Sequence, residues 1–118
     1  MKPDLQEILV KWQKILRLQD WVITIQYAKH FDLNPDAQGQ VGWNLFKKSA
    51  HIKVMDPGDY DPSWPFPQDV QKTVVHELLH LHMAPFDETK ADSLGDKMLE
   101  QAIECISSAL VDRDRRAA

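Results

Sequence analysis

A run of nine residues, Val-Val-His-Glu-Leu-Leu-His-Leu-His at positions 74 to 82, constrains the fold of this 118-residue chain more than any other segment. On a helix, residues four apart lie one turn above one another, so the imidazoles of His76 and His80 can converge on a single ion. The helical repeat rotates Glu77 about 100° from His76, which places its carboxylate beside a water at that ion and not among the ligands. The segment therefore predicts a helix with one apolar face and one polar site.

This helix is expected to begin near Gln68 or Asp69 and to run to about Met83, before Pro85. It should be the most buried helix of the molecule, because it has more apolar residues than a solvent-facing helix needs: Val70, Val74, Val75, Leu78, Leu79 and Leu81. Burying two histidines and a glutamate there without partners would cost on the order of several kcal/mol. The sequence therefore favours a metal ion over ordinary hydrogen-bonded core histidines.

Hydrophobic periodicity predicts the remaining elements. Apolar residues at helical spacing indicate helices over residues 4 to 19 and 89 to 111, and alternation indicates a strand at 21 to 27 and a hairpin at 40 to 55. Segment 56 to 67 holds four of the seven prolines and should form an irregular loop. The expected fold is a single α+β domain spanning residues 1 to 118, with a three-stranded, mainly antiparallel sheet that has one exposed face.

Two details of the outer helices can also be predicted. Asp4, with Glu7 three residues later, gives the first helix a capping-box start. The tail from 112 to 116 should fray at the end of the last helix. The core stripe of that helix is expected at Ala91, Leu94, Met98, Leu99, Ala102, Ile103, Ile106 and Leu110.

Composition excludes several classes of protein. No segment approaches the unbroken apolar run of about 20 residues that spans a bilayer, so we expect no membrane span. The amino terminus lacks the apolar core and cleavage site of a secretory signal, and we expect a cytoplasmic product. Cys105 is the only cysteine, which excludes an internal disulfide and a cysteine-based zinc site. Any metal must be bound by histidine and carboxylate.

Charge is distributed unevenly along the chain. Residues 1 to 55 carry 8 Lys and Arg against 5 Asp and Glu, whereas residues 56 to 118 carry 6 against 13. An acidic carboxyl-terminal half suits a cation better than a phosphate backbone. No basic residues interleave with the four tryptophans in the manner of a base-stacking surface, so no nucleic-acid partner is indicated.

A hydrolytic zinc site needs one more protein ligand than the two histidines of the helix expected at 68 to 83 provide. Zinc takes four tetrahedral ligands and keeps one position for water, so the chain must supply a third residue. His82 follows His80 by two residues, about 200° around the helix, and therefore points away from the pair. The third ligand must come from another element.

The motif also carries a resemblance to a known family. His76, Glu77 and His80 spell H-E-x-x-H, and an acidic residue follows on the next helix; this combination resembles the gluzincin class of zinc metallopeptidases, typified by thermolysin. The short chain is also similar to small metallopeptidase-like proteins encoded in bacteriophage and prophage genomes, in which Glu-Gln-Ala, here at 100 to 102, occupies the same place in the last helix. The resemblance implies a minimal zincin-like fold.

The resemblance implies roles for individual residues. Glu100, twenty residues after His80, would be the third ligand of Zn²⁺, and Glu77 the general base. Glu104, one turn later, would brace a ligand histidine, although the family has Asp at that place. The chain has no counterpart of thermolysin's second lobe and no motif-matched Tyr or His to stabilise an oxyanion.

Helical phasing leaves the third ligand open. Glu100 falls about 120° from the centre of the last helix's expected apolar stripe, at its flank. Asp96, one turn earlier and nearer the stripe, is the main rival ligand, followed by Asp92 and Asp87.

The expected function is hydrolysis of peptide bonds by a zinc-activated water, with a peptide or protein as substrate. An extended peptide could pair with the exposed edge of the hairpin at 40 to 55. Two alternatives remain: a catalytically weak or inactive zinc-binding module that regulates or binds another protein, and a zinc hydrolase of a non-peptide substrate.

Overall fold

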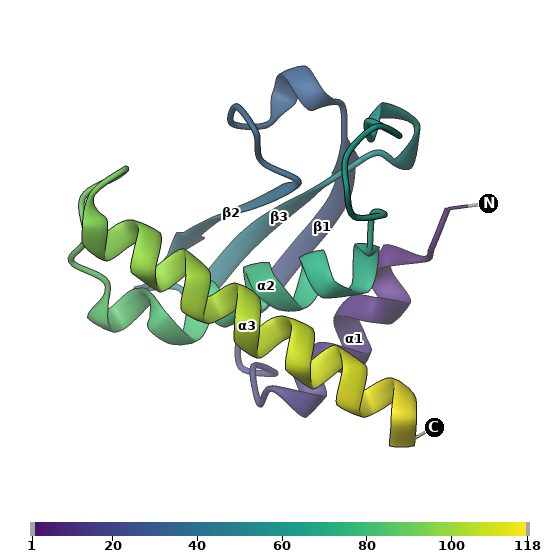
Figure 1. Ribbon diagram of the computed structural model, residues 1–118. Coiled ribbons are helices and arrows are strands. Elements are labelled where there is room, and N and C mark those ends of the chain that lie inside the picture. The colour runs from purple at the N-terminus through teal and green to yellow at the C-terminus, as the bar shows by residue number, and fades with distance from the viewer. Residues whose placement is uncertain (1, 118) are drawn as a thin grey trace.

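The computed structural model describes residues 2 to 117 and confirms the expected order of helix, three strands, helix, helix (Figure 1). Three short 3₁₀ turns lie in the connecting loops, at His30–Asp32, Pro57–Asp59 and Ala84–Phe86. The fold is therefore α+β, as expected. Its elements are α1 (Leu5–Ile15), β1 (Val22–Ala28), β2 (Gly39–Asn44), β3 (Ser49–Met55), α2 (Val70–Met83) and α3 (Leu94–Ala117).

The sheet is mixed, which corrects the expectation of a mainly antiparallel one. The strand order is β1-β3-β2; β2 and β3 form the expected antiparallel hairpin, whereas β1 pairs parallel with β3. The alternating pattern of β3 supplies Ala50, Ile52 and Val54 to the core, and this strand lies in the centre of the sheet. Strand periodicity identifies each strand, but it contains no information about which edge of a hairpin accepts the third strand.

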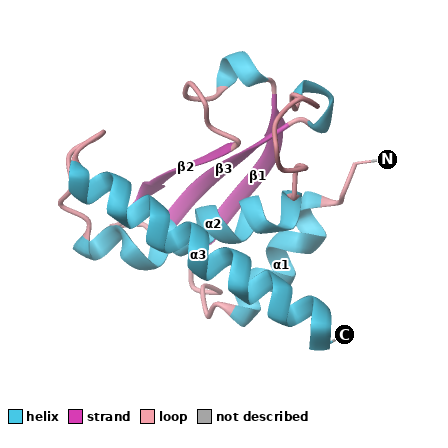
Figure 2. Ribbon diagram, in the orientation of Figure 1, coloured by secondary structure: helices cyan, strands magenta, loops and turns pink. Residues whose placement is uncertain are grey.

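The helices cover one face of the sheet, as Figure 2 shows. The face they cover is apolar: residues of β1, β3 and α1 join α2 in one core cluster that includes Leu9, Trp12, Ile52, Val54 and Leu78. α2 packs against both the sheet and α3, and it contributes six buried residues where α1 and α3 contribute three each. The prediction that the motif helix is the most buried one is confirmed.

α1 is shorter than expected. Its amino terminus is capped as predicted, with the Asp4 side chain accepting a hydrogen bond from the Glu7 backbone N–H. It ends at Ile15 because Arg17 adopts a left-handed backbone conformation, φ 61°, and the Leu18 N–H then donates to the Gln13 carbonyl.

α3 begins later and ends later than expected. Asp87 accepts hydrogen bonds from the backbone and hydroxyl of Thr89, and the Ser93 hydroxyl accepts from the Asp96 N–H, so the loop continues to a cap at Ser93. The tail does not fray, because its charged side chains are anchored: the Arg115 guanidinium donates two hydrogen bonds to Asp69. Further ion pairs join Lys72 to Asp112 and Lys11 to Asp114.

The buried stripe of α3 also differs from the prediction. Leu94, Met98 and Ile106 are 76%, 56% and 49% exposed, so the residues expected at the core lie mostly at the surface. Of the predicted stripe only Ile103 is buried, and the helix also buries Ser107 and Val111, which were not predicted. No helix within residues 2 to 117 is long and apolar enough to cross a membrane.

Candidate metal centre

α2 positions the two histidines on the side of the helix that faces α3. Its amino terminus is fixed by Asp69, whose side chain accepts a hydrogen bond from the Lys72 N–H. The opposite side of the helix is held in the core by Val74, Val75, Leu78 and Leu81. The imidazoles of His76 and His80, one turn apart, are 14% and 13% exposed and their ring centroids lie 5.2 Å apart.

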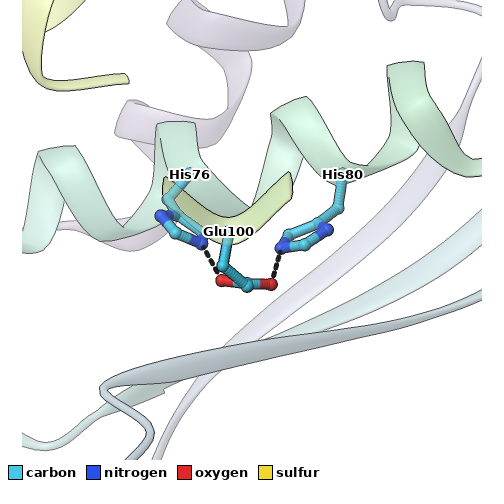
Figure 3. A group of neighbouring side chains, drawn as sticks. All are labelled: His76, His80 and Glu100. Carbon is cyan, nitrogen blue, oxygen red and sulfur yellow. Dashed lines mark hydrogen bonds and ion pairs between the residues drawn. The ribbon is translucent and has the colours of Figure 1, made fainter. Parts of the chain in front are cut away.

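Glu100 lies between the two imidazoles (Figure 3). Its Oε2 is 3.0 Å from His76 Nε2 and its Oε1 is 2.8 Å from His80 Nε2. One ligand atom from each of these three residues lies within 4.8 Å of the others, and no other set of His, Cys, Asp or Glu in residues 2 to 117 is as close. The structure therefore brings together the three residues that the resemblance implied as ligands.

Glu104 lies on the far side of the His76 ring. Its Oε2 is 2.8 Å from His76 Nδ1. A neutral imidazole carries one N–H, and donation from Nδ1 to Glu104 leaves the lone pair of Nε2 directed toward Glu100. This is the tautomer that a metal ligand requires, and an outer carboxylate commonly stabilises it.

The rival residues do not join this group. Asp87 accepts hydrogen bonds from Thr89, and Asp96 accepts one from the Asp92 N–H. His82 Nε2 lies 2.6 Å from the Leu16 carbonyl oxygen, at the end of α1 and away from the pair.

The buried stripe of α3 explains why Glu100 reaches the histidines. Glu100 precedes Ile103 by three residues, and Ser107 and Val111 follow at four-residue steps, so all four share one face of the helix. Glu100 lies at the flank of the stripe predicted from the sequence, but Leu94, Met98 and Ile106 of that stripe are exposed, so they do not set the face that packs on α2.

We call His76, His80 and Glu100 the metal group. Glu77 is buried beside this group and against strand β2. It is 6% exposed, and within the described chain its carboxylate accepts no hydrogen bond. Burial raises the pKa of Glu77 to about 7, with the negative charges of Glu100 and Glu104 acting in the same direction and His76 opposing them. The carboxylate can thus exist in either protonation state near neutral pH.

The two histidines respond differently to the same surroundings. Burial of the His76 ring disfavours its charged form, but the carboxylates of Glu77, Glu100 and Glu104 outweigh burial and raise its pKa. For His80, burial and the nearby His76 outweigh the attraction of Glu100, and its pKa is lowered.

Gly39 allows β2 to pass close to Glu77. A Cβ on Gly39 would lie 2.6 Å from Thr73 Cγ2, 3.2 Å from the Lys53 carbonyl oxygen and 3.3 Å from Glu77 Oε2. No side chain fits there without movement of β2 or α2.

The metal group and Glu77 open onto a cleft of about 990 Å³ between β2 and the two helices α2 and α3. Its walls include Gly39, Val41 and Trp43 of β2 and, from the proline-rich loop, Tyr60 and Phe66. The Met55 N–H donates to the Gln38 carbonyl, so alternate residues of β2 bond to β3. Gly39, Val41 and Trp43 then direct their backbone N–H and C=O groups toward the free edge of the sheet.

The donor set fits a zinc ion. Two imidazole nitrogens and one carboxylate are a common zinc ligand set, and three protein ligands leave one position of a tetrahedron open. His76, His80 and Glu100 would hold the ion, and Glu104 Oε2, 2.8 Å from His76 Nδ1, is placed to accept the N–H of that ring when Nε2 binds a metal. The ligands do not discriminate strongly between zinc and other divalent transition metals.

No protein-family model, curated protein or solved structure matches this chain.

Two features of the site were not found from the sequence. Gly39 sits at the start of a strand, where nothing in the neighbouring residues indicates a close approach to a helix 34 residues later. Asp87, Asp92 and Asp96 were considered only as ligands, but they line the wall of the cleft. The spacing of these three aspartates from His80 in the sequence does not predict that they line the cleft.

Proposed function

We propose that this protein is a zinc-dependent metallopeptidase, with His76, His80 and Glu100 as ligands and Glu77 as the general base. The observation that carries the proposal is the placement of Glu77. Its buried carboxylate, with a pKa of about 7, lies beside the three converging ligand residues and faces the free edge of β2. A carboxyl that only stabilised the fold would have no reason to be buried there without a hydrogen-bond donor.

When bound, Zn²⁺ would supply an activated water near neutral pH and would polarise the carbonyl of the substrate. Glu77 accepts the proton of the attacking water and returns it to the leaving nitrogen of the peptide bond. Glu104 keeps the Nδ1 proton of His76 in place, which orients the ring.

The free edge of β2 supports a peptide as the substrate. Gly39, Val41 and Trp43 line the cleft and offer unpaired backbone donors and acceptors along one wall. An extended peptide can pair with these groups as an added strand, which would hold its backbone opposite Glu77. A small non-peptide substrate would leave most of this edge unused.

The test compares zinc-loaded wild-type protein with the Glu77→Gln variant on a broad peptide library. The variant should retain one zinc per chain, since Glu77 is not a ligand, and should lose about 10²- to 10⁴-fold in hydrolysis because no base accepts the proton. Glu88→Gln, an exposed residue outside the cleft, is the matched control and should keep full activity.

Full hydrolysis by a Glu77→Gln protein with stoichiometric zinc would refute the mechanism. A wild-type zinc protein that cleaves no peptide would refute the proposed activity. In that case a non-catalytic zinc module or a different hydrolase would become the better interpretation.

A further inference from the structure

The two ends of the cleft differ in how their charges are compensated. At one end lie Gln68 and Gln38, both linked to Met55 by hydrogen bonds of 2.8 and 2.9 Å. Both β2 and α2 start at this end and run together toward the other end, where the loop to α3 begins (Figure 1). α3 runs back in the opposite direction, since Arg115 pairs with Asp69 at the first end.

At the end where β2 and α2 start, the charged residues are mostly neutralised. Asp69 is paired with Arg115, and Lys72 with Asp112. Asp36 is the one carboxylate of the cleft wall at that end that forms no ion pair within residues 2 to 117.

At the other end, beyond His80, three carboxylates line the cleft: Asp87, Asp92 and Asp96. None of them forms an ion pair with Lys, Arg or His in the part of the chain that the structure describes. The charges of Asp87 and His80 are near enough to interact, so Asp87 lies close to one of the proposed metal ligands. We define these three residues as the acidic wall.

The acidic wall is not arranged to chelate a metal. Its ligand atoms do not converge as those of His76, His80 and Glu100 do, within 4.8 Å of one another. Spread along a concave surface, such charges attract a flexible cation, and the low-dielectric walls of a cleft concentrate their field. Glu77 lines the same cleft, is 6% exposed and accepts no hydrogen bond from residues 2 to 117, which indicates independently that this space receives a ligand.

We propose that the acidic wall binds a lysine or arginine side chain of the substrate, on the amino-terminal side of the bond that is cleaved. This inference rests on the proposed function, because it assigns substrate positions relative to Glu77. A peptide pairs most favourably with a strand edge in the antiparallel direction. β2 runs toward the acidic wall, so an antiparallel peptide begins at the wall and reaches Glu77 further along its chain.

The first experiment profiles the cleavage sites of zinc-loaded wild-type protein in a complex peptide library by mass spectrometry. Lys and Arg should be enriched about tenfold within the three residues before the cleaved bond, relative to the three residues after it. Because both positions belong to the same peptides, attraction by the overall charge of the protein cannot produce this asymmetry. Raising the ionic strength should reduce the enrichment.

The second experiment substitutes the wall. The Asp92→Asn and Asp96→Asn double variant should abolish the enrichment. Asn tolerates the left-handed backbone of Asp92, φ 61°, and its amide oxygen can still accept the hydrogen bond that Asp96 accepts. The matched control is Asp32→Asn with Glu88→Gln, which removes the same charge from exposed positions outside the cleft and should leave the enrichment unchanged.

A binding measurement separates failure of this inference from failure of the proposed function. The zinc-loaded E77Q protein is titrated with a fluorescein-labelled Ala-Lys peptide and its Ala-Gln counterpart, and the Lys peptide should bind about tenfold more tightly. Absence of cleavage together with this preference refutes the peptidase but supports the cationic ligand. Three results would each refute binding of Lys or Arg by the acidic wall. They are cleavage without Lys or Arg enrichment, an enrichment that survives the wall substitutions, and equal binding of the two peptides.

Discussion

Glu77 lies where its environment opposes its ionisation, and this has a consequence for stability that does not depend on a metal. Its pKa is raised from 4.5 to about 7 in the folded protein, mainly by burial. Between these values the folded state binds more protons at Glu77 than the unfolded state, so the contribution of this residue to stability is greatest below pH 4.5 and is lost as the pH rises through 7. Burying the charged carboxylate is what destabilises the protein above pH 7.

The Glu77→Gln substitution should remove this pH dependence. Relative to wild type, the metal-free variant should gain about 2 to 3 kcal/mol in free energy of unfolding between pH 5 and pH 8, since each pKa unit corresponds to about 1.4 kcal/mol. Urea denaturation of both proteins in chelator, at the two pH values, measures the difference. An identical pH dependence in the two proteins would contradict a buried, perturbed carboxyl.

Gly39 provides a second prediction for a single residue. In Gly39→Ala the new Cβ would approach Thr73 Cγ2 within 2.6 Å, which should lower the free energy of unfolding by about 1 to 3 kcal/mol. Adding Thr73→Ser should restore part of the loss, because it removes Cγ2 and keeps the hydroxyl that donates to the Asp69 carbonyl. Gly42→Ala, where a Cβ would meet nothing within 4 Å, is the control for a glycine change in the same strand. Equal effects at the two glycines would contradict the close approach.

At the scale of elements, the position of α3 determines whether the metal group forms. Glu100 can reach His76 and His80 only while the face that carries Ile103, Ser107 and Val111 packs closely on α2. Ser107 is fully buried and small, and its hydroxyl is satisfied by the Glu104 carbonyl. A larger side chain at this position should move α3 away from α2.

Ser107→Leu is therefore expected to weaken zinc binding without altering a ligand. Overpacking should cost about 1 to 3 kcal/mol of stability. Competition with a chromophoric chelator should show a lower zinc affinity as Glu100 moves from the histidines. Ala109→Leu, on the exposed side of the same helix, should change neither quantity much. Wild-type zinc affinity in a destabilised Ser107→Leu protein would contradict the dependence of the site on this packing.

The elements also show which parts of the fold can be predicted from sequence. The helices, the hairpin and the H-E-x-x-H geometry follow from local spacing, and these predictions agree with the structure. The orientation of α3 does not follow from local spacing, because Leu94, Met98 and Ile106 form a more apolar stripe than the residues that pack against α2. Its start could have been predicted more closely from Ser93 and Asp96, which form a cap signal within the expected helix. The parallel pairing of β1 depends on long-range packing, which periodicity does not record.

At the scale of the whole molecule, the core and the metal group are separate. The core cluster joins α1, the sheet, α2 and Val111 of α3, and it contains none of the proposed ligands. The protein should therefore fold without metal, unlike small domains whose folding requires zinc.

Zinc should nevertheless stabilise the folded chain by binding it preferentially. At a free zinc concentration about 100 times the Kd, the gain is about 2.7 kcal/mol, or roughly 10 °C in Tm for a domain of this size. Thermal unfolding followed by circular dichroism, with and without chelator, should show this shift and unchanged helical content. Loss of the helical signal in chelator would contradict a core that is independent of the metal.

Residues from two helices, α2 and α3, should form one zinc site, and anomalous diffraction at the zinc edge from crystals of the zinc-loaded protein can locate the ion. A single peak is expected at about 2.0 to 2.2 Å from His76 Nε2, His80 Nε2 and a Glu100 oxygen, with an open position facing Glu77. A zinc ion bound elsewhere, or one bound by the histidines with Glu100 turned away, would contradict it.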